Sequence, residues 1–117
     1  MLDFKEFKIE TNKNSSSIPV RFIFIDNEID EESIEYIEEK IKEYEIYLEY
    51  DSKGEFNFEY NKKFSIEMII TFPTRKVPED KKGLQNFVNR YVMDFSEYYH
   101  RINKLDNICD TNMSVET

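Results

Sequence analysis

Four stretches of the chain have the patterns of β-strands. Residues 55–60 and 64–72 alternate between apolar and polar side chains, and the polar turn 61–63 separates them. Segment 18–25 is rich in β-branched and aromatic residues, and a weaker alternation over 4–11 predicts a strand that pairs with it. Short turns between strands of this kind favour an antiparallel sheet with one face on a core.

Two other stretches have the three- and four-residue spacing of amphipathic helices. The first begins near Asp30, where acids suit the positive end of the helix dipole, and its apolar stripe runs to about Tyr44. The second runs from Leu84 to Leu105, about six turns, with Pro78 expected in its first turn. Residues 44–50 fit either a helix or a strand, and we place a strand from Ile46.

These elements predict an α+β fold of order ββαβββα, an antiparallel sheet with two helices packed on one face. Residues 1–106 form a single α+β domain and residues 107–117 a flexible C-terminal tail. The glycine of the turn 51–54 is expected to have a positive φ. The expected core contains Phe22, Phe24, Ile37, Ile41, Phe58, Ile66, Met68, Ile70, Phe87, Tyr91, Phe95 and Ile102.

Net charge limits the classes of partner that we expect, and cysteine content indicates the cellular compartment. The 117 residues carry a net charge of −9, which disfavours direct binding to nucleic acid or anionic membranes because phosphates repel acids. Charges interrupt every apolar run of the first ten residues, so no signal peptide is expected, and no apolar run approaches the length of a membrane span. The single cysteine, Cys109, fits a cytoplasmic protein.

No motif predicts an enzyme, a metal site or a cofactor. Asp26, Glu28 and Asp30 have the spacing that begins a calcium-binding loop, but Glu31 stands where that loop needs glycine and Ile37 where it needs glutamate. The only histidine cannot complete a two-motif metal site, and two glycines cannot form a phosphate-binding loop. We therefore expect a non-enzymatic protein without cofactor or metal.

Basic residues near three turns offer one further alternative. They could converge at one end of the sheet and form a phosphate site. The overall negative charge favours the other interpretation, in which these residues keep loops solvated and sheet edges unpaired. These residues are Lys62, Lys63, Arg75, Lys76, Lys81 and Lys82.

Acidity is concentrated in residues 26–51. Twelve acids and two bases give this segment a charge of −10, so the rest of the chain sums to +1. On a helix, Tyr36 is expected to be exposed among carboxylates, as an interface anchor for a basic partner would be; a solvated charged face is the alternative. The candidate partner-binding residues are Glu31, Glu32, Glu35, Tyr36, Glu38, Glu39, Glu43, Glu45 and Glu49.

These features favour an acidic inhibitor that docks on a basic partner, a nucleic-acid-binding effector or a nuclease. Small size, segregated acidity and the Ile-, Lys- and Asn-rich composition of AT-rich genomes resemble phage-encoded antagonists of bacterial defence nucleases, anti-CRISPR proteins that act as nucleic-acid mimics included. The resemblance is one of type and assigns no residue. Alternatives are an immunity protein for a basic nuclease toxin, or a homo-oligomeric structural or accessory protein that exposes Tyr98 or Tyr99. The oligomeric state and the identity of the partner stay open.

Overall fold

The protein is built on a four-stranded antiparallel sheet. The computed structural model describes residues 2–10 and 16–115, with side chains as far as Asn103. The strands are β1 (Leu2–Ile9), β2 (Ser17–Asp26), β3 (Lys53–Asn61) and β4 (Lys63–Pro73). The helical elements are η1 (Glu31–Ser33), α1 (Ile34–Lys42), η2 (Glu43–Tyr47), η3 (Thr74–Lys76) and α2 (Lys81–Val115). The predicted α+β fold, with an antiparallel sheet and two helices, is confirmed.

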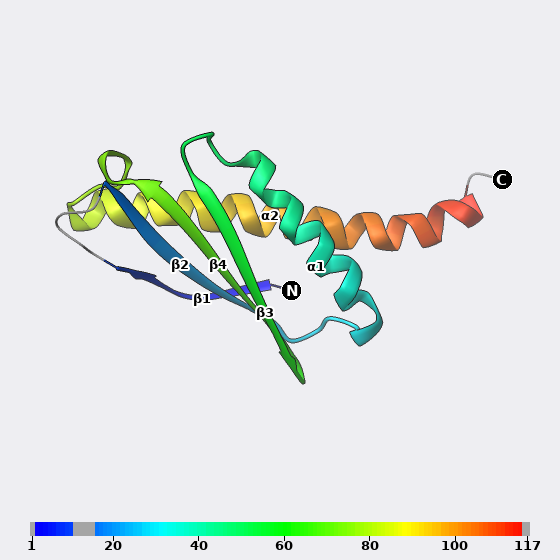
Figure 1. Cartoon of the computed structure of the whole chain (residues 1–117). Helices are drawn as coiled ribbons and strands as arrows, with labels where there is room; N and C mark the ends of the chain where they lie inside the picture. The colour runs from blue at the N-terminus through cyan, green and yellow to red at the C-terminus, as the bar shows by residue number, and fades with distance from the viewer. Residues whose placement is uncertain (1, 11–15, 116–117) are drawn as a thin grey trace.

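The strands lie in the order β1-β2-β4-β3. Both β2 and β3 are antiparallel to β4, so they run parallel to each other with β4 between them. The connection from β2 to β3 is therefore a crossover, and η1, α1 and η2 form it. Figure 1 shows α2 running along the sheet and extending past it towards the C-terminus.

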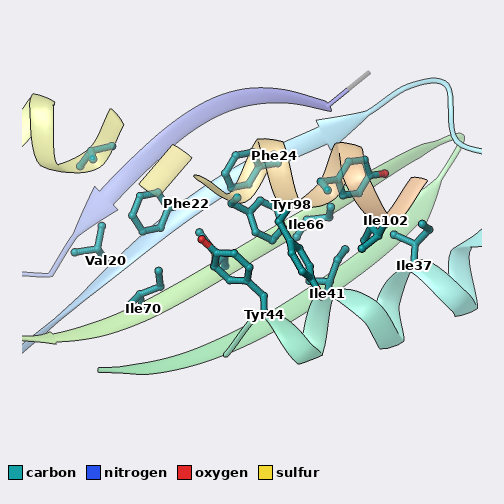
Figure 2. Close-up of a cluster of buried hydrophobic side chains, with 14 of the residues drawn as sticks. Val20, Phe22, Phe24, Ile37, Ile41, Tyr44, Ile66, Ile70, Tyr98 and Ile102 are labelled. Carbon is teal, nitrogen blue, oxygen red and sulfur yellow. The ribbon is translucent and has the colours of Figure 1, made fainter. Parts of the chain in front are cut away.

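One core lies between the sheet and the two helices. Alternation places one face of β2 and β4 inside, and the pairs Phe22–Met68 and Phe24–Ile66 lie side by side on it. Figure 2 shows this cluster, with Ile37 and Ile41 of α1 closing it from the helical side. Most of the expected core is buried, but three of its members are only partly buried: Phe58, Phe87 and Tyr91.

A bulge in the edge strand β1 keeps its apolar side chains on the core face of the sheet. Phe4 pairs with Phe24 and Glu6 pairs with Ile23, which leaves Lys5 as the extra residue. The extra residue moves the alternation by one position, so that Phe4 and Phe7 face the same side. This explains why the alternation of this strand is weak in the sequence.

The predicted strand from Ile46 is wrong, and the order of elements is ββαββα. The 3-10 helix η2 follows α1 directly, and it buries Tyr44 three residues after the buried Ile41. A tight turn is needed there because the chain must reverse to enter β3. Leu48 then packs over Gly54, where an added Cβ would lie 2.9 Å from Leu48 Cδ1.

Positive φ occurs at a lysine rather than at the expected glycine. Among the described residues no glycine has a positive φ, whereas Lys62 has φ 64°. Lys62 is the only residue between β3 and β4, whose last and first residues, Asn61 and Lys63, already pair. A reversal this tight requires the left-handed conformation at its centre. Gly54 serves instead to admit Leu48.

Helix α2 begins after Pro78 and extends beyond the predicted end. Asp80 Oδ2 accepts a 2.7 Å hydrogen bond from Gly83 N–H, so Asp80 caps the helix and Pro78 precedes it. The helix continues to Val115 because no proline or glycine follows Gly83 to end it. The side chains of the tail predicted at 107–117 lie outside the described residues, and its flexibility stays a prediction.

Both Tyr98 and Tyr99 are buried, contrary to the expected exposure of one of them. The Tyr98 hydroxyl donates to the carbonyl of Lys40 at 2.5 Å, whereas Tyr99 reaches Asp26 at the end of β2. Although the two residues are neighbours on α2, Tyr98 is therefore covered by α1 and Tyr99 by the sheet. Within the described residues no helix is long and apolar enough to cross a membrane.

Candidate partner-binding surface

The crossover from β2 to β3 carries the predicted partner-binding carboxylates, and we call residues 26–51 the acidic crossover. Its glutamates lie on η1, α1, η2 and the turn before β3. Glu38 is half-buried, and the other glutamates of the predicted set are exposed: Glu31, Glu32, Glu35, Glu39, Glu43, Glu45 and Glu49. These exposed glutamates therefore follow one another along the single crossover segment between β2 and β3.

Part of this charge is neutralised by η3. Lys76 forms ion pairs with Glu49 and Asp51, and Arg75 lies 2.8 Å from Asp51. With these two bases, the charge of the acidic crossover changes from −10 to −8. Glu49 is thus engaged within the protein, which weakens its case as a partner-binding residue.

The remaining glutamates are largely unpaired. Lys40 reaches Glu43 at 3.8 Å. No other described residue forms an ion pair or a side-chain hydrogen bond with Glu31, Glu32, Glu35, Glu38, Glu39 or Glu45. Glu39 lies four residues from both Glu35 and Glu43, and each such like-charge pair costs a helix a few tenths of a kcal/mol. Among the described residues this repulsion is offset only at Glu43, by Lys40.

Tyr36 is not the exposed anchor that the helical pattern predicted. Its ring is half-buried and packs against the core, and the Lys40 ammonium lies 5.6 Å from the ring centroid. The stripe is wider than the pattern indicated, because α1 contacts both β3 and α2. A residue judged to face water on an isolated helix is therefore partly covered in the folded protein.

The exposed apolar residues of the acidic crossover lie instead in and after η2. Ile46 is 76% exposed, Tyr47 62% and Tyr50 98%. The pattern missed them because alternation over 46–50 indicated a strand. A spacing of three would place Tyr47 and Tyr50 on the same side of a 3-10 helix as the buried Tyr44, so no local signal in the sequence indicated their exposure.

A pocket of about 220 Å³ opens beside this patch, between η2 and α2. From the η2 side it is lined by Tyr44, Tyr47 and Leu48. From α2 it is lined by Tyr91, Asp94, Glu97, Tyr98 and Arg101. Figure 2 shows Tyr44 and Tyr98 approaching each other from these two elements, and their ring centroids are 5.1 Å apart. The sequence did not single out this pocket, since its two walls are far apart along the chain.

The tyrosines of the pocket lie in a negative environment. Burial raises the pKa of Tyr44, and the charge of Asp94 raises it further. Burial likewise raises the pKa of Tyr98, with Glu43 adding to the effect and Arg101 opposing it. Near neutral pH these hydroxyls are therefore protonated, and the pocket offers aromatic faces and carboxylates to a ligand.

The basic residues do not converge into one phosphate site. Lys62 and Lys63 lie at the start of β4, whereas Arg75 and Lys76 follow its end. The eleven residues of β4 span roughly 37 Å at 3.4 Å per residue. Arg75 and Lys76 are also occupied by acids of the crossover.

Asp26, the first of the acids considered for calcium, serves other contacts. Asp26 is buried and accepts hydrogen bonds from the Tyr99 hydroxyl at 2.7 Å and from Glu28 N–H at 2.8 Å. Among the described residues, no group of three or more His, Cys, Asp or Glu side chains is arranged to hold a metal ion.

Comparisons with protein families, with curated proteins and with solved structures find no match for the chain.

Proposed function

We propose that the protein is an acidic binding protein that docks the acidic crossover on a basic, nucleic-acid-handling partner and inhibits it. The observation that carries this proposal is the exposure of Ile46, Tyr47 and Tyr50 beside glutamates that have no partner in the described chain. Aromatic residues that become buried in an interface contribute much of its binding energy, and surrounding charges select the partner. The cytoplasm is the proposed site of action.

The exposed apolar residues support docking rather than solubility alone. A solubilising surface needs charge and gains nothing from a large ring in water. Tyr50 is almost fully exposed, and Tyr47 and Ile46 lie three and four residues before it, at the end of η2. Large apolar side chains exposed within a charged surface are typical of a protein-binding site.

The charges indicate what the partner carries. The acidic crossover retains about eight negative charges after its internal pairing with Arg75 and Lys76. Grooves that hold nucleic acid present lysine and arginine at high density, and they are complementary to such a surface. Occupation of the groove would exclude nucleic acid, which is the action expected of a phage anti-defence inhibitor.

The test compares two triple charge reversals. Glu35, Glu39 and Glu43 are replaced by lysine in one variant. The matched control replaces Glu6, Glu55 and Glu59, which lie on the sheet face opposite the helices. Both variants change the net charge from −9 to −3, so they differ only in where the charge is removed.

The parent and the two triple variants are each immobilised and exposed to a host extract. The captured proteins are then eluted and identified. We expect the parent and the control to retain a basic protein that duplex DNA displaces and that salt above about 0.15 M releases. The reversal on α1 and η2 should lose it. Equal capture by both triple variants would contradict the proposal, and concentration-dependent self-association of the parent without any basic partner would favour a homo-oligomer.

A further inference from the structure

The pocket between η2 and α2 combines a cluster of tilted aromatic rings with carboxylates that have no ion-pair partner. The rings of Tyr44, Tyr47 and Tyr98 form a triad with centroid separations of 5.1, 5.4 and 5.9 Å. Asp94 and Glu97 line the same pocket, and neither forms an ion pair with another described residue. Aromatic faces and carboxylates both attract cations, and here they border one cavity.

We propose that this pocket accepts the guanidinium group of an arginine side chain of the protein partner, an inference that rests on the proposed function and names the group its surface takes. A planar guanidinium stacks on tyrosine rings, and its fork of donors matches a carboxylate. At about 220 Å³ the pocket has room for the end of one side chain.

The pocket's own arginine does not already fill this role. Among the described residues, the cation placed over a ring is Lys40, which lies on Tyr36 outside the pocket. Arg101 lines the pocket without lying over any of its tyrosines. Its positive charge opposes an incoming cation, while Asp94 and Glu97 favour one, so the charged residues that line the pocket sum to −1.

Tyr47 links the pocket to the exposed patch of the acidic crossover. Its ring is 62% exposed and also contacts Tyr98 at 5.4 Å. An arginine inserted beside Tyr47 would bring the partner's surface to the end of η2, where Ile46 and the unpaired Glu45 are also exposed. The pocket therefore defines a single point of attachment within a broad charged surface.

The first experiment measures binding of a small probe. Acetyl-arginine amide and its neutral isostere acetyl-citrulline amide are titrated into the full chain, and the tyrosine ring signals are followed by NMR. We expect a saturable change with the arginine probe and none with the citrulline probe. Arg101→Gln should tighten binding of the arginine probe roughly twofold by removing a like charge, whereas Asp94→Asn should weaken it.

Two exposed tyrosines provide a matched pair of variants. Tyr47→Ala removes a ring of the pocket and should weaken probe binding roughly fivefold, as expected for one cation–π contact. Tyr50→Ala removes a ring outside the pocket and should leave probe binding unchanged. Equal binding of both probes, or weaker binding in Arg101→Gln, would overturn the inference.

The second experiment repeats the capture of the partner with Tyr47→Ala and Asp94→Asn. Loss of capture in both variants supports the inference. If both variants capture normally while the reversal of Glu35, Glu39 and Glu43 does not, the proposed function stands and the arginine pocket is wrong. If that reversal also captures normally, the proposed function itself fails. Binding of the arginine probe without any effect on capture would indicate a free small cation and overturn the assignment to a partner's side chain.

Discussion

The hydroxyl of Tyr99 donates a 2.7 Å hydrogen bond to Oδ2 of Asp26, joining the middle of α2 to the last residue of β2. Both side chains are buried, with 2% and 4% of their surfaces exposed. Asp26 also accepts a hydrogen bond from Glu28 N–H, which turns the chain towards the acidic crossover. The contact between Tyr99 and Asp26, which are far apart in the sequence, thus holds the first residue of the acidic crossover in place.

Tyr99→Phe should destabilise the protein by about 1.5–3 kcal/mol, the usual value for a hydrogen bond to a charged group. The buried carboxylate of Asp26 would lose a donor that water cannot readily replace. The free energy of unfolding in urea measures the effect. The double variant with Asp26→Ala should cost less than the sum of the two single changes, and strict additivity would show that the two residues act separately.

Phe95→Ala should cost about 3–5 kcal/mol because it leaves a cavity in the core. The ring is fully buried and lies 4.9 Å from Phe24 and 5.2 Å from Tyr44. Met93→Ala, on the same helix but 69% exposed, is the control and should change stability little. Thermal or urea unfolding of the three proteins tests the packing of α2, and equal stabilities would refute it.

Lys62→Gly should stabilise the protein by about 0.5–1 kcal/mol. A left-handed lysine costs about 1–2 kcal/mol, and glycine avoids most of this cost while losing some entropy on folding. Lys63→Gly, one residue into β4, should instead destabilise the protein because its backbone is extended. The urea concentration at the unfolding midpoint is measured for both variants and for the parent. A lower midpoint for Lys62→Gly than for the parent would contradict the prediction.

Stability should fall as the pH rises above about 10, the pKa of tyrosine in an unfolded chain. Burial raises the pKa of Tyr44, Tyr98 and Tyr99 in the folded protein. Below pH 10 the folded and the unfolded protein both keep these protons, so the buried tyrosines contribute fully to stability. Above pH 10 only the unfolded protein releases them, so unfolding becomes more favourable. Urea unfolding from pH 8 to 11 measures the effect, and Tyr44→Phe should lose less stability above pH 10 than the parent.

Calcium or zinc should leave the melting temperature unchanged. The carboxylate of Asp26 is directed to Tyr99 and to Glu28 N–H, so it is not open to a metal together with Asp30. Thermal unfolding with increasing metal concentration is the measurement. A saturable rise of several degrees would show that a metal site exists after all.

The sequence alone determined the strands at the centre of the sheet and the long helix. In β2 and β4, every second residue is apolar, so a shift of register by one residue would turn Phe22, Phe24, Ile66 and Met68 away from the core. The stripe from Leu84 is similarly unambiguous over many turns. Local periodicity suffices in these places because the same residues that form the element also form the core.

Only the tertiary structure decided the candidate site. Tyr36 and Tyr47 look alike in the sequence, yet contacts with β3 and α2 cover much of the first and leave the second exposed. Lys76 neutralises Asp51 from 25 residues away, and the pocket joins η2 to a helix that begins more than thirty residues later. Exposure, pairing and cavity shape depend on which distant elements pack together, and no local pattern of apolar and charged residues contains that information.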